Sequence, residues 1–158
     1  MVPRERTKTP IAPGRARESS DGESPEVEGV PSLDEIESRL ALDDHTGALE
    51  LARTRLAARP TERASLAYVR RCEETLTEMY ASHIGDFGRR LSVSMRGSEL
   101  QWLSIDHRAG FLVAQIDGTI TVEDLLEICG MARLDALRIL HDLLQQKVIS
   151  LESDGRGR

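Results

Sequence analysis

The feature that most constrains the fold is a regular succession of helix and turn signals over residues 105–151. Apolar residues at helical spacing predict three helices in this segment, over 107–116, 121–128 and 133–146. Tight turns are predicted at Asp117-Gly118 and at Gly130, because glycine adopts a positive φ without steric cost. A final apolar run over 148–151 predicts a strand. The expected order is therefore helix, turn, short helix, turn, longer helix and strand.

Polar residues at the predicted helix starts support these boundaries. Asp106 is expected to cap the first helix and Thr121 the second, with Asp124 completing an arrangement close to a capping box. The side chains predicted to face the core are Phe111, Leu112, Leu125, Leu126, Ile128, Leu134, Leu137, Ile139, Leu140, Leu143 and Leu144. A helix–turn–helix followed by a strand is the layout of a small winged-helix domain, which can bind DNA or serve as a protein-docking module.

A more specific pattern covers Asp106–Ile149, with the sequence DHRAGFLVAQIDGTITVEDLLEICGMARLDALRILHDLLQQKVI. This segment resembles a winged-helix-like domain found near the C-termini of many bacterial regulatory proteins, notably from myxobacteria. The resemblance implies a bacterial, cytoplasmic setting and a regulatory or adaptor role, and it implies no chemistry. Lys147 stands where the pattern has a glycine before the final strand, so the resemblance does not fix the geometry of that turn.

Residues 1–31 have the composition of a disordered tail. Five of the six prolines lie there, and the sparse apolar side chains show no period, so packing cannot offset the entropy of ordering. The first half of the tail is basic, and the second half, from Glu18 to Glu28, is acidic. The tail is interpreted either as a solubilising leader or as a short linear docking motif.

Three helices are predicted after the tail. Ser32 and Glu35 form a capping-box signature for the first helix. The second is predicted over about 46–58, and Thr61 is expected to cap a third that reaches about Ser82. Inward faces are predicted for Leu33, Ile36, Leu40, Ala48, Leu49, Ala52, Leu56, Leu66, Val69, Cys72, Leu76, Met79 and Tyr80.

The segment Asp44–Pro60 resembles the second half of a tetratricopeptide repeat. Ala48 and Ala52 take positions where that repeat needs small residues for close packing, whereas Arg55 replaces a residue that is usually small. Such repeats normally need about three copies to bury their faces. The hairpin is therefore expected to pack on the C-terminal unit, on another copy of the chain or on a partner.

Together these patterns predict a mainly α chain with four parts. They are a disordered tail (1–31), a tetratricopeptide-like three-helix module (32–84), a winged-helix-like α+β domain (85–152) and a frayed end (153–158). An alternating run from Arg90 to Met95 predicts a strand at the start of the α+β domain, and Glu99–Ser104 is predicted to be a second short strand or a turn. The final strand is expected to pair with one of these two segments.

Composition argues against catalysis and metal binding. Cys72 and Cys129 form no CxxC pair, the four histidines are dispersed, and no HExxH, GxSxG or phosphate-binding glycine loop occurs. The chain is therefore predicted to be non-enzymatic, without cofactor, metal or small-molecule ligand. No segment approaches the roughly 18 apolar residues of a transmembrane helix, so a cytoplasmic protein without membrane insertion is expected.

The charge pattern disfavours DNA binding, which is the alternative function. The net charge is −6, and residues 85–152 hold seven basic and ten acidic side chains, a net of −3. Phosphate neutralisation needs the opposite balance, and Asp135 and Asp142 lie on the predicted recognition helix. The candidate DNA contacts would be Arg133 and Arg138 on that helix, with Arg89, Arg90 and Arg96 on phosphates.

Protein binding is the favoured function: an adaptor or regulatory subunit in a bacterial signalling or assembly pathway. The candidate interaction residues are Arg53, Arg59, Arg63, Arg70 and Arg71. Such a basic surface suits an acidic motif, in a partner or in the chain's own segment from Glu18 to Glu28. The alternative is that these arginines pair with neighbouring glutamates, namely Glu62, Glu73 and Glu74. Self-association through the hairpin is a further option.

Overall fold

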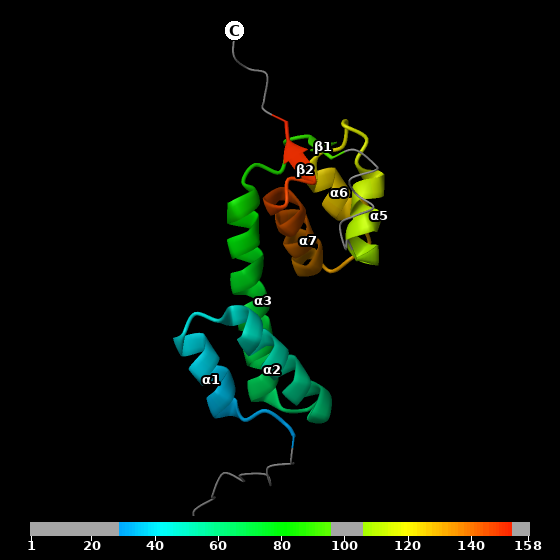
Figure 1. The fold of residues 1–158 in the computed structure, drawn as a ribbon. Coiled ribbons are helices and arrows are strands. Elements are labelled where there is room, and N and C mark those ends of the chain that lie inside the picture. The colour runs from blue at the N-terminus through cyan, green and yellow to red at the C-terminus, as the bar shows by residue number, and fades with distance from the viewer. Residues whose placement is uncertain (1–28, 96–105, 153–158) are drawn as a thin grey trace, which may run out of the picture.

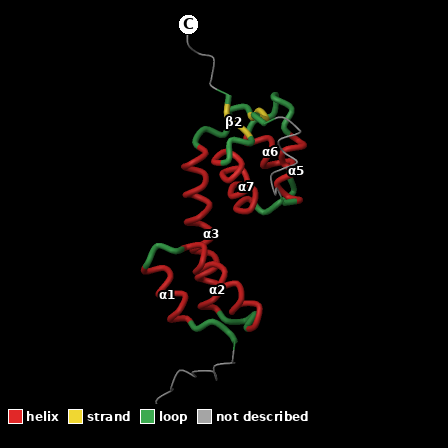
Figure 2. Tube along the Cα trace, viewed as in Figure 1, coloured by secondary structure: helices red, strands yellow, loops and turns green. Residues whose placement is uncertain are grey.

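The structure, a computed structural model, describes residues 29–95 and 106–152. Most of the predicted tail, the predicted frayed end and Arg96 lie outside these residues. The described chain is mainly helical with a small two-stranded sheet (Figure 2), as predicted. In order, the elements are α1 (Leu33–Ala41), α2 (His45–Ala58), α3 (Arg63–Ile84), β1 (Leu91–Val93), α5 (His107–Gln115), α6 (Val122–Ile128), α7 (Arg133–Gln145) and β2 (Ile149–Leu151).

Helix α3 is the longest element and joins two groups of helices (Figure 1). Its N-terminal part packs against α2, and α1 packs against α2 in turn. Its C-terminal part packs against α7, which also contacts α5 and α6. One continuous helix therefore belongs to both groups, and the hairpin packs against the C-terminal unit through it.

The first hydrophobic cluster, here called the hairpin cluster, lies among α1, α2 and α3. Its buried members are Ile36, Ala48, Leu49, Ala52, Val69, Cys72 and Leu76. Ala48 and Ala52 are fully buried, and their one-carbon side chains let α2 approach the neighbouring helices closely. Leu134 of α7 packs against this cluster from outside the hairpin.

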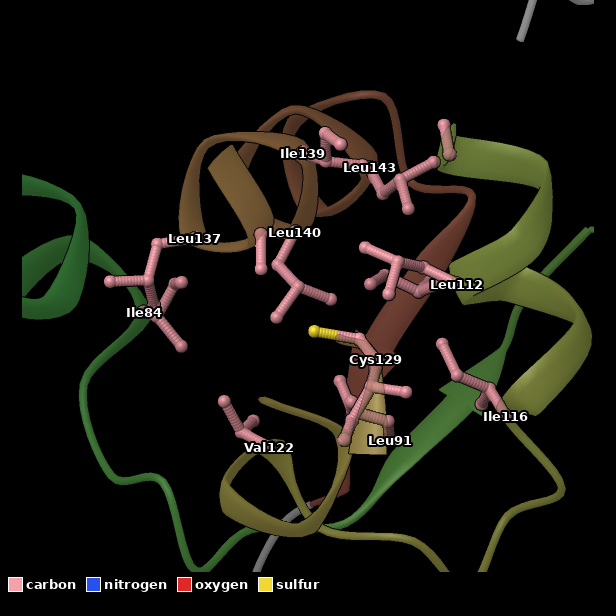
Figure 3. Close-up of a cluster of buried hydrophobic side chains, with 14 of the residues drawn as sticks. Ile84, Leu91, Leu112, Ile116, Val122, Cys129, Leu137, Ile139, Leu140 and Leu143 are labelled. Carbon is pink, nitrogen blue, oxygen red and sulfur yellow. The ribbon is translucent and has the colours of Figure 1, made fainter. Parts of the chain in front are cut away.

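The second hydrophobic cluster, here called the C-terminal cluster, is larger and lies against one side of α7 (Figure 3). It takes in buried side chains from the end of α3 and from β1, α5, α6, α7 and β2, namely Ile84, Leu91, Ala109, Leu112, Ile116, Val122, Leu125, Cys129, Ala136, Leu137, Ile139, Leu140, Leu143, Val148 and Ile149. Ile84 and Leu137 join the end of α3 to α7 at one side of this cluster (Figure 3). Leucine supplies much of its volume, as the scarcity of aromatic residues requires.

The two strands pair antiparallel, with Leu91 opposite Leu151 and Val93 opposite Ile149. This pairing confirms the predicted closure of the sheet by the final strand. On its other side, β1 is hydrogen-bonded to the loop before α6, where the Leu91 amide donates to the Ile120 carbonyl at 2.9 Å. Helices α5, α6 and α7 lie between β1 and β2 in sequence, so these two strands are not joined as a hairpin.

The predicted caps at three helix starts are confirmed. Ser32 and Glu35 form the capping box of α1, and Asp106 accepts from the Ala109 amide at the start of α5. Thr121 and Asp124 form a complete capping box on α6. Hydrogen bonds from Thr121 hold the pKa of Asp124 below its usual range.

The predicted start of α3 is wrong. Glu62, and not Thr61, is the N-cap, and its side chain makes no capping hydrogen bond. The reason is that its carboxylate is occupied by Arg55 of α2, at 2.7 Å. The helix also ends later than predicted, at Ile84, where Gly85 adopts a φ of 83°.

Four side chains predicted to face the core are partly exposed. They are Leu66 and Met79 on α3, Phe111 on α5 and Ile128 on α6, with exposures of 40%, 37%, 42% and 57%. Helical periodicity identifies an apolar side of a helix but does not determine how much of that side a neighbouring element covers. Here the covered strip is narrower than the apolar strip.

The turn from α7 into β2 contains a strained residue. Lys147 adopts a φ of 58°, the left-handed conformation that glycine adopts most easily. The chain reverses there, with the Lys147 amide donating to the Leu144 carbonyl and the Val148 amide to the Leu143 carbonyl. The turn therefore keeps a glycine-like backbone although the residue is a lysine. Asp43, between α1 and α2, has a similar φ of 56°.

Candidate functional site

The five arginines predicted to bind a partner do not form one uniform surface. Arg53 makes a 2.8 Å ion pair with Glu73, and Arg59 lies 3.8 Å from Glu62. Pairing with neighbouring glutamates therefore holds for these two. Three arginines remain exposed along α3, namely Arg63, Arg70 and Arg71. Their helical positions place them away from the buried side that carries Cys72.

The hairpin also contains a buried polar network that the sequence did not reveal. Arg55 is 9% exposed and donates through Nε and one NH2 group to both carboxylate oxygens of Glu62, each at 2.7 Å. Its other NH2 group donates to the Pro31 carbonyl at 2.7 Å. Ser65 adds a hydroxyl donor to Glu62. These contacts fix the chain entering α1 and the α2–α3 turn, so Arg55 is structural.

The arginines predicted to bind DNA are also partly engaged within the chain. Arg89 donates to the Glu152 and Leu151 carbonyls, both at 3.0 Å, and so anchors the end of β2. Arg133 stacks over the Phe87 ring at 5.4 Å from its centroid. Arg90 is exposed and bridges to Thr121 through its backbone. Arg138 is exposed, and no ion pair of it is found in the part of the chain that the structure describes.

Helix α7, the predicted recognition helix, is packed between other elements. Helix α3 lies along one side, and α5 and α6 lie along the other (Figure 1). The middle of its outward side is a narrow stripe formed by Asp135, Arg138 and Asp142, here called the α7 stripe. Two of its three charges are negative, and a phosphate backbone would be repelled by them.

A groove open to solvent lies beside the α7 stripe, where α2, α3 and α7 meet. It encloses about 400 Å³ including its mouth. Its apolar lining is formed by Leu49, Leu76, Tyr80 and Leu134, and its polar lining by Thr46, Glu50, Arg53, Asp135 and Arg138. Below, this feature is called the three-helix groove. A second hollow lies on the other side of Arg138, between α5 and α7.

Aromatic contacts hold α3 against α7 next to the three-helix groove. His141 of α7 stacks on His83 of α3, with ring centroids 5.2 Å apart. It also contacts Tyr80, at 5.2 Å between centroids. Because Tyr80 lines the groove as well, these contacts fix one of its walls. The sequence carried a weak signal for this interface, since Leu134 and His141 lie on one side of α7, two turns apart.

The charges around the groove and the second hollow are mixed but acidic in sum. Four carboxylates line them, namely Glu50, Asp106, Asp135 and Asp142, against two guanidinium groups, Arg53 and Arg138. Arg53 is offset by its ion pair with Glu73, and Asp135 by a 3.5 Å contact with Arg108. Glu50 makes no ion pair within the described residues. The lining of the three-helix groove itself is balanced, with Glu50 and Asp135 against Arg53 and Arg138.

Within residues 29–95 and 106–152, no group of three or more His, Cys, Asp or Glu side chains could hold a metal ion. Cys72 is fully buried, and burial raises the pKa of its thiol. Among the described helices, none combines the length and apolar composition needed to cross a bilayer. Comparisons with protein-family models, with curated proteins and with solved structures found no match to this chain. The two family resemblances noted above therefore stay predictions.

Proposed function

We propose that this protein is a non-enzymatic adaptor or regulatory subunit that binds another protein, in a bacterial signalling or assembly pathway. In this proposal residues 32–84 form a tetratricopeptide-like module and residues 85–152 a winged-helix-like unit. The two are joined through α3, so that the hairpin completes its packing on α7 instead of on further repeats. The proposal retains the cytoplasmic location expected from the sequence.

One observation carries the proposal: the three-helix groove lies at the junction of the two units. Leu49 and Leu76 come from the hairpin, and Leu134 comes from α7. Protein interfaces combine apolar contacts with polar groups, and the groove is lined by residues of both kinds. A groove built from both units also gives a physical reason for their being held together.

The proposal can be tested by blocking the groove without touching the core. Thr46 is exposed at the groove, and no hydrogen bond of its side chain is found among the described residues, so Thr46→Trp should fill the groove while the fold is retained. Thr54→Trp, on an exposed part of the same helix outside the groove, is the matched control. Affinity capture from a native bacterial lysate should recover a stoichiometric protein with wild type and Thr54→Trp, but not with Thr46→Trp. No such protein, or equal recovery by all three, would refute the proposal.

DNA binding remains the alternative, because α6, the turn at Gly130 and α7 follow one another as in a helix-turn-helix. A gel-shift titration at several salt concentrations tests it. Salt-sensitive, sequence-preferring binding that is lost in Arg133→Ala would favour a transcriptional regulator. We expect none, since α7 is packed on both sides and the α7 stripe carries two aspartates.

A further inference from the structure

We infer that the exposed side of α3 docks an acidic segment of this same chain, residues 18–28, which lies outside the described residues. The docking surface, here called the α3 arginine face, is formed by Arg63, Arg70 and Arg71. This contact goes beyond the proposed function, since it lies within one chain and involves neither the three-helix groove nor a partner protein. Of the two sources of an acidic motif that the sequence left open, the geometry favours the chain's own segment.

The α3 arginine face carries positive charge that the described residues do not neutralise. No ion pair of its three arginines is found within the described part of the chain. The glutamates nearest to them in sequence on the N-terminal side of each are engaged by α2 or belong to its partners. Glu62 accepts from Arg55 at 2.7 Å, and Glu73 accepts from Arg53 at 2.8 Å. Residues 51–73 contain six arginines against two glutamates, although the whole chain has a net charge of −6. An acidic ligand is therefore the complement of this surface.

The acidic segment has the charge and the reach to cover this surface. It contains no basic residue and five acidic ones, namely Glu18, Asp21, Glu23, Glu26 and Glu28. The chain that follows it is fixed beside the start of α3, because Arg55 binds both the Pro31 carbonyl and the N-cap of α3, Glu62. The described chain also begins at this end of the molecule (Figure 1). The eleven residues of the segment span roughly 35 Å when extended, whereas Arg63 and Arg71 are about 12 Å apart along the helix axis.

The order of charges along the tail matches the order along the helix. Beyond the arginines, the same exposed side of α3 carries Glu74 and Glu78. In the tail, Arg15 and Arg17 precede the acidic segment, so they are farther from the attachment point. A tail that runs from the start of α3 toward its C-terminus would place acids on the arginines and then arginines on the two glutamates. Because the tail is tethered, its effective concentration at this surface is on the order of millimolar, which favours it over an acidic segment of another molecule.

The test attaches a nitroxide to the tail of the full chain and measures its effect on each backbone amide by NMR. Ser19→Cys supplies the attachment site, and wild type taken through the same labelling corrects for any reaction at the buried Cys72 and Cys129. At low salt the nitroxide should remove at least half the signal intensity of residues 70–78, which are two turns or more from the attachment point of the tail, and leave α5 and α6 unchanged. Raising the salt to about 1 M, where the Debye length is about 3 Å, should restore the signals. Full intensity at residues 70–78 in low salt would overturn the inference.

Charge variants separate docking on α3 from a general attraction between the tail and the rest of the chain. In the spin-labelled chain, the triple variant Arg63→Gln, Arg70→Gln and Arg71→Gln should restore most of the lost intensity. The matched control removes three exposed arginines elsewhere, by Arg90→Gln, Arg108→Gln and Arg138→Gln, and should leave the loss unchanged. Equal losses in the two triple variants would overturn the inference.

A mixing experiment distinguishes docking within one chain from docking on a second copy. Spin-labelled chains without nitrogen-15 are mixed with unlabelled chains that carry nitrogen-15, so that only contacts between molecules reduce the signals. We expect no loss at residues 70–78 in this mixture. A loss as large as that in the spin-labelled chain itself would place the tail on a second copy and overturn the intramolecular contact.

Discussion

The two hydrophobic clusters achieve stability in different ways. The C-terminal cluster contains only apolar side chains and thiol, with leucines of α5, α6 and α7 fully buried at its centre. The hairpin cluster is smaller and depends on two alanines for close packing, and Leu134 of α7 packs against it. Beside it lies the Arg55 network, in which a buried guanidinium joins three segments of chain.

This difference indicates that the C-terminal region gains its stability from apolar burial, whereas the hairpin needs further contacts. A small helical hairpin buries little area per residue, so directed polar contacts and a borrowed leucine compensate. A larger apolar core has no need of them. Each region contains one buried cysteine, Cys72 in the hairpin cluster and Cys129 in the C-terminal cluster, so thiol labelling can report on each separately.

The largest effect is expected from Leu140→Ala in the C-terminal cluster. Leu140 is fully buried, and its truncation should lower the free energy of unfolding by about 2–5 kcal/mol. Urea denaturation measures this loss, and both cysteines should label faster. Ile36→Ala, equally buried in the hairpin cluster, is the counterpart, and it should speed the labelling of Cys72 much more than that of Cys129. If Ile36→Ala speeds the labelling of both thiols equally, the two clusters unfold as one cooperative unit and do not differ in their stability.

The next effect should come from the Arg55 network. Arg55→Met removes the bidentate donor of Glu62 and leaves the Pro31 carbonyl without the Arg55 hydrogen bond, at a cost of about 2–3 kcal/mol in the free energy of unfolding. Arg53→Met removes the exposed pair with Glu73 and should cost less than about 1 kcal/mol. Urea denaturation of both variants under the same conditions measures the two losses in the free energy of unfolding. A similar loss in both would mean that burial of the network contributes nothing.

Acidification should weaken both regions, through Glu62 and Asp44 in the hairpin and through Asp117 in the C-terminal unit. Hydrogen bonds from Arg55 lower the pKa of Glu62 below 4.5, and backbone and side-chain donors lower the pKa of Asp44 and Asp117 below 3.8. A lowered folded-state pKa stabilises the fold above the ordinary pKa, and this contribution is lost as pH falls through the ordinary and then the lowered value. Stability measured from pH 6 down to about pH 3 should therefore fall.

The variant Glu62→Gln checks that assignment. It should be less stable at neutral pH and show a shallower fall of stability below pH 4.5, because the residue no longer titrates. Asp117→Asn should change the slope only nearer to pH 3.8. If the free energy of unfolding of Glu62→Gln depends on pH as steeply as that of wild type, Glu62 does not contribute to the loss of stability in acid.

The smallest effects are expected from the two left-handed residues, one in each region. Lys147→Gly should raise the free energy of unfolding by about 0.5–1 kcal/mol, because glycine adopts a φ near 58° without the steric cost. Asp43→Gly should gain only a few tenths of a kcal/mol, since aspartate tolerates this conformation better. Lys147→Ala is the control and should give no gain. Destabilisation by Lys147→Gly would show that the lysine side chain has a stabilising contact.

The sequence by itself determined the local structure. The caps at Ser32, Asp106 and Thr121 and the turns at Gly118 and Gly130 were predicted, because each depends on hydrogen bonds or dihedral angles within about five residues. That the final strand closes a small sheet was also predicted, but its partner was left open between two segments, and the structure pairs it with β1.

Only the tertiary structure decided which side chains of each helix are covered and where a partner could bind. Ile128 and Leu134 are both apolar at helical spacing, yet the first is exposed and the second packs against another cluster. Arg55 was noted only as a departure from a repeat pattern, although it is the centre of a buried network. The three-helix groove joins residues from 46 to 138, and such contacts depend on how elements far apart in sequence pack together. Periodicity within one helix carries no information about that packing.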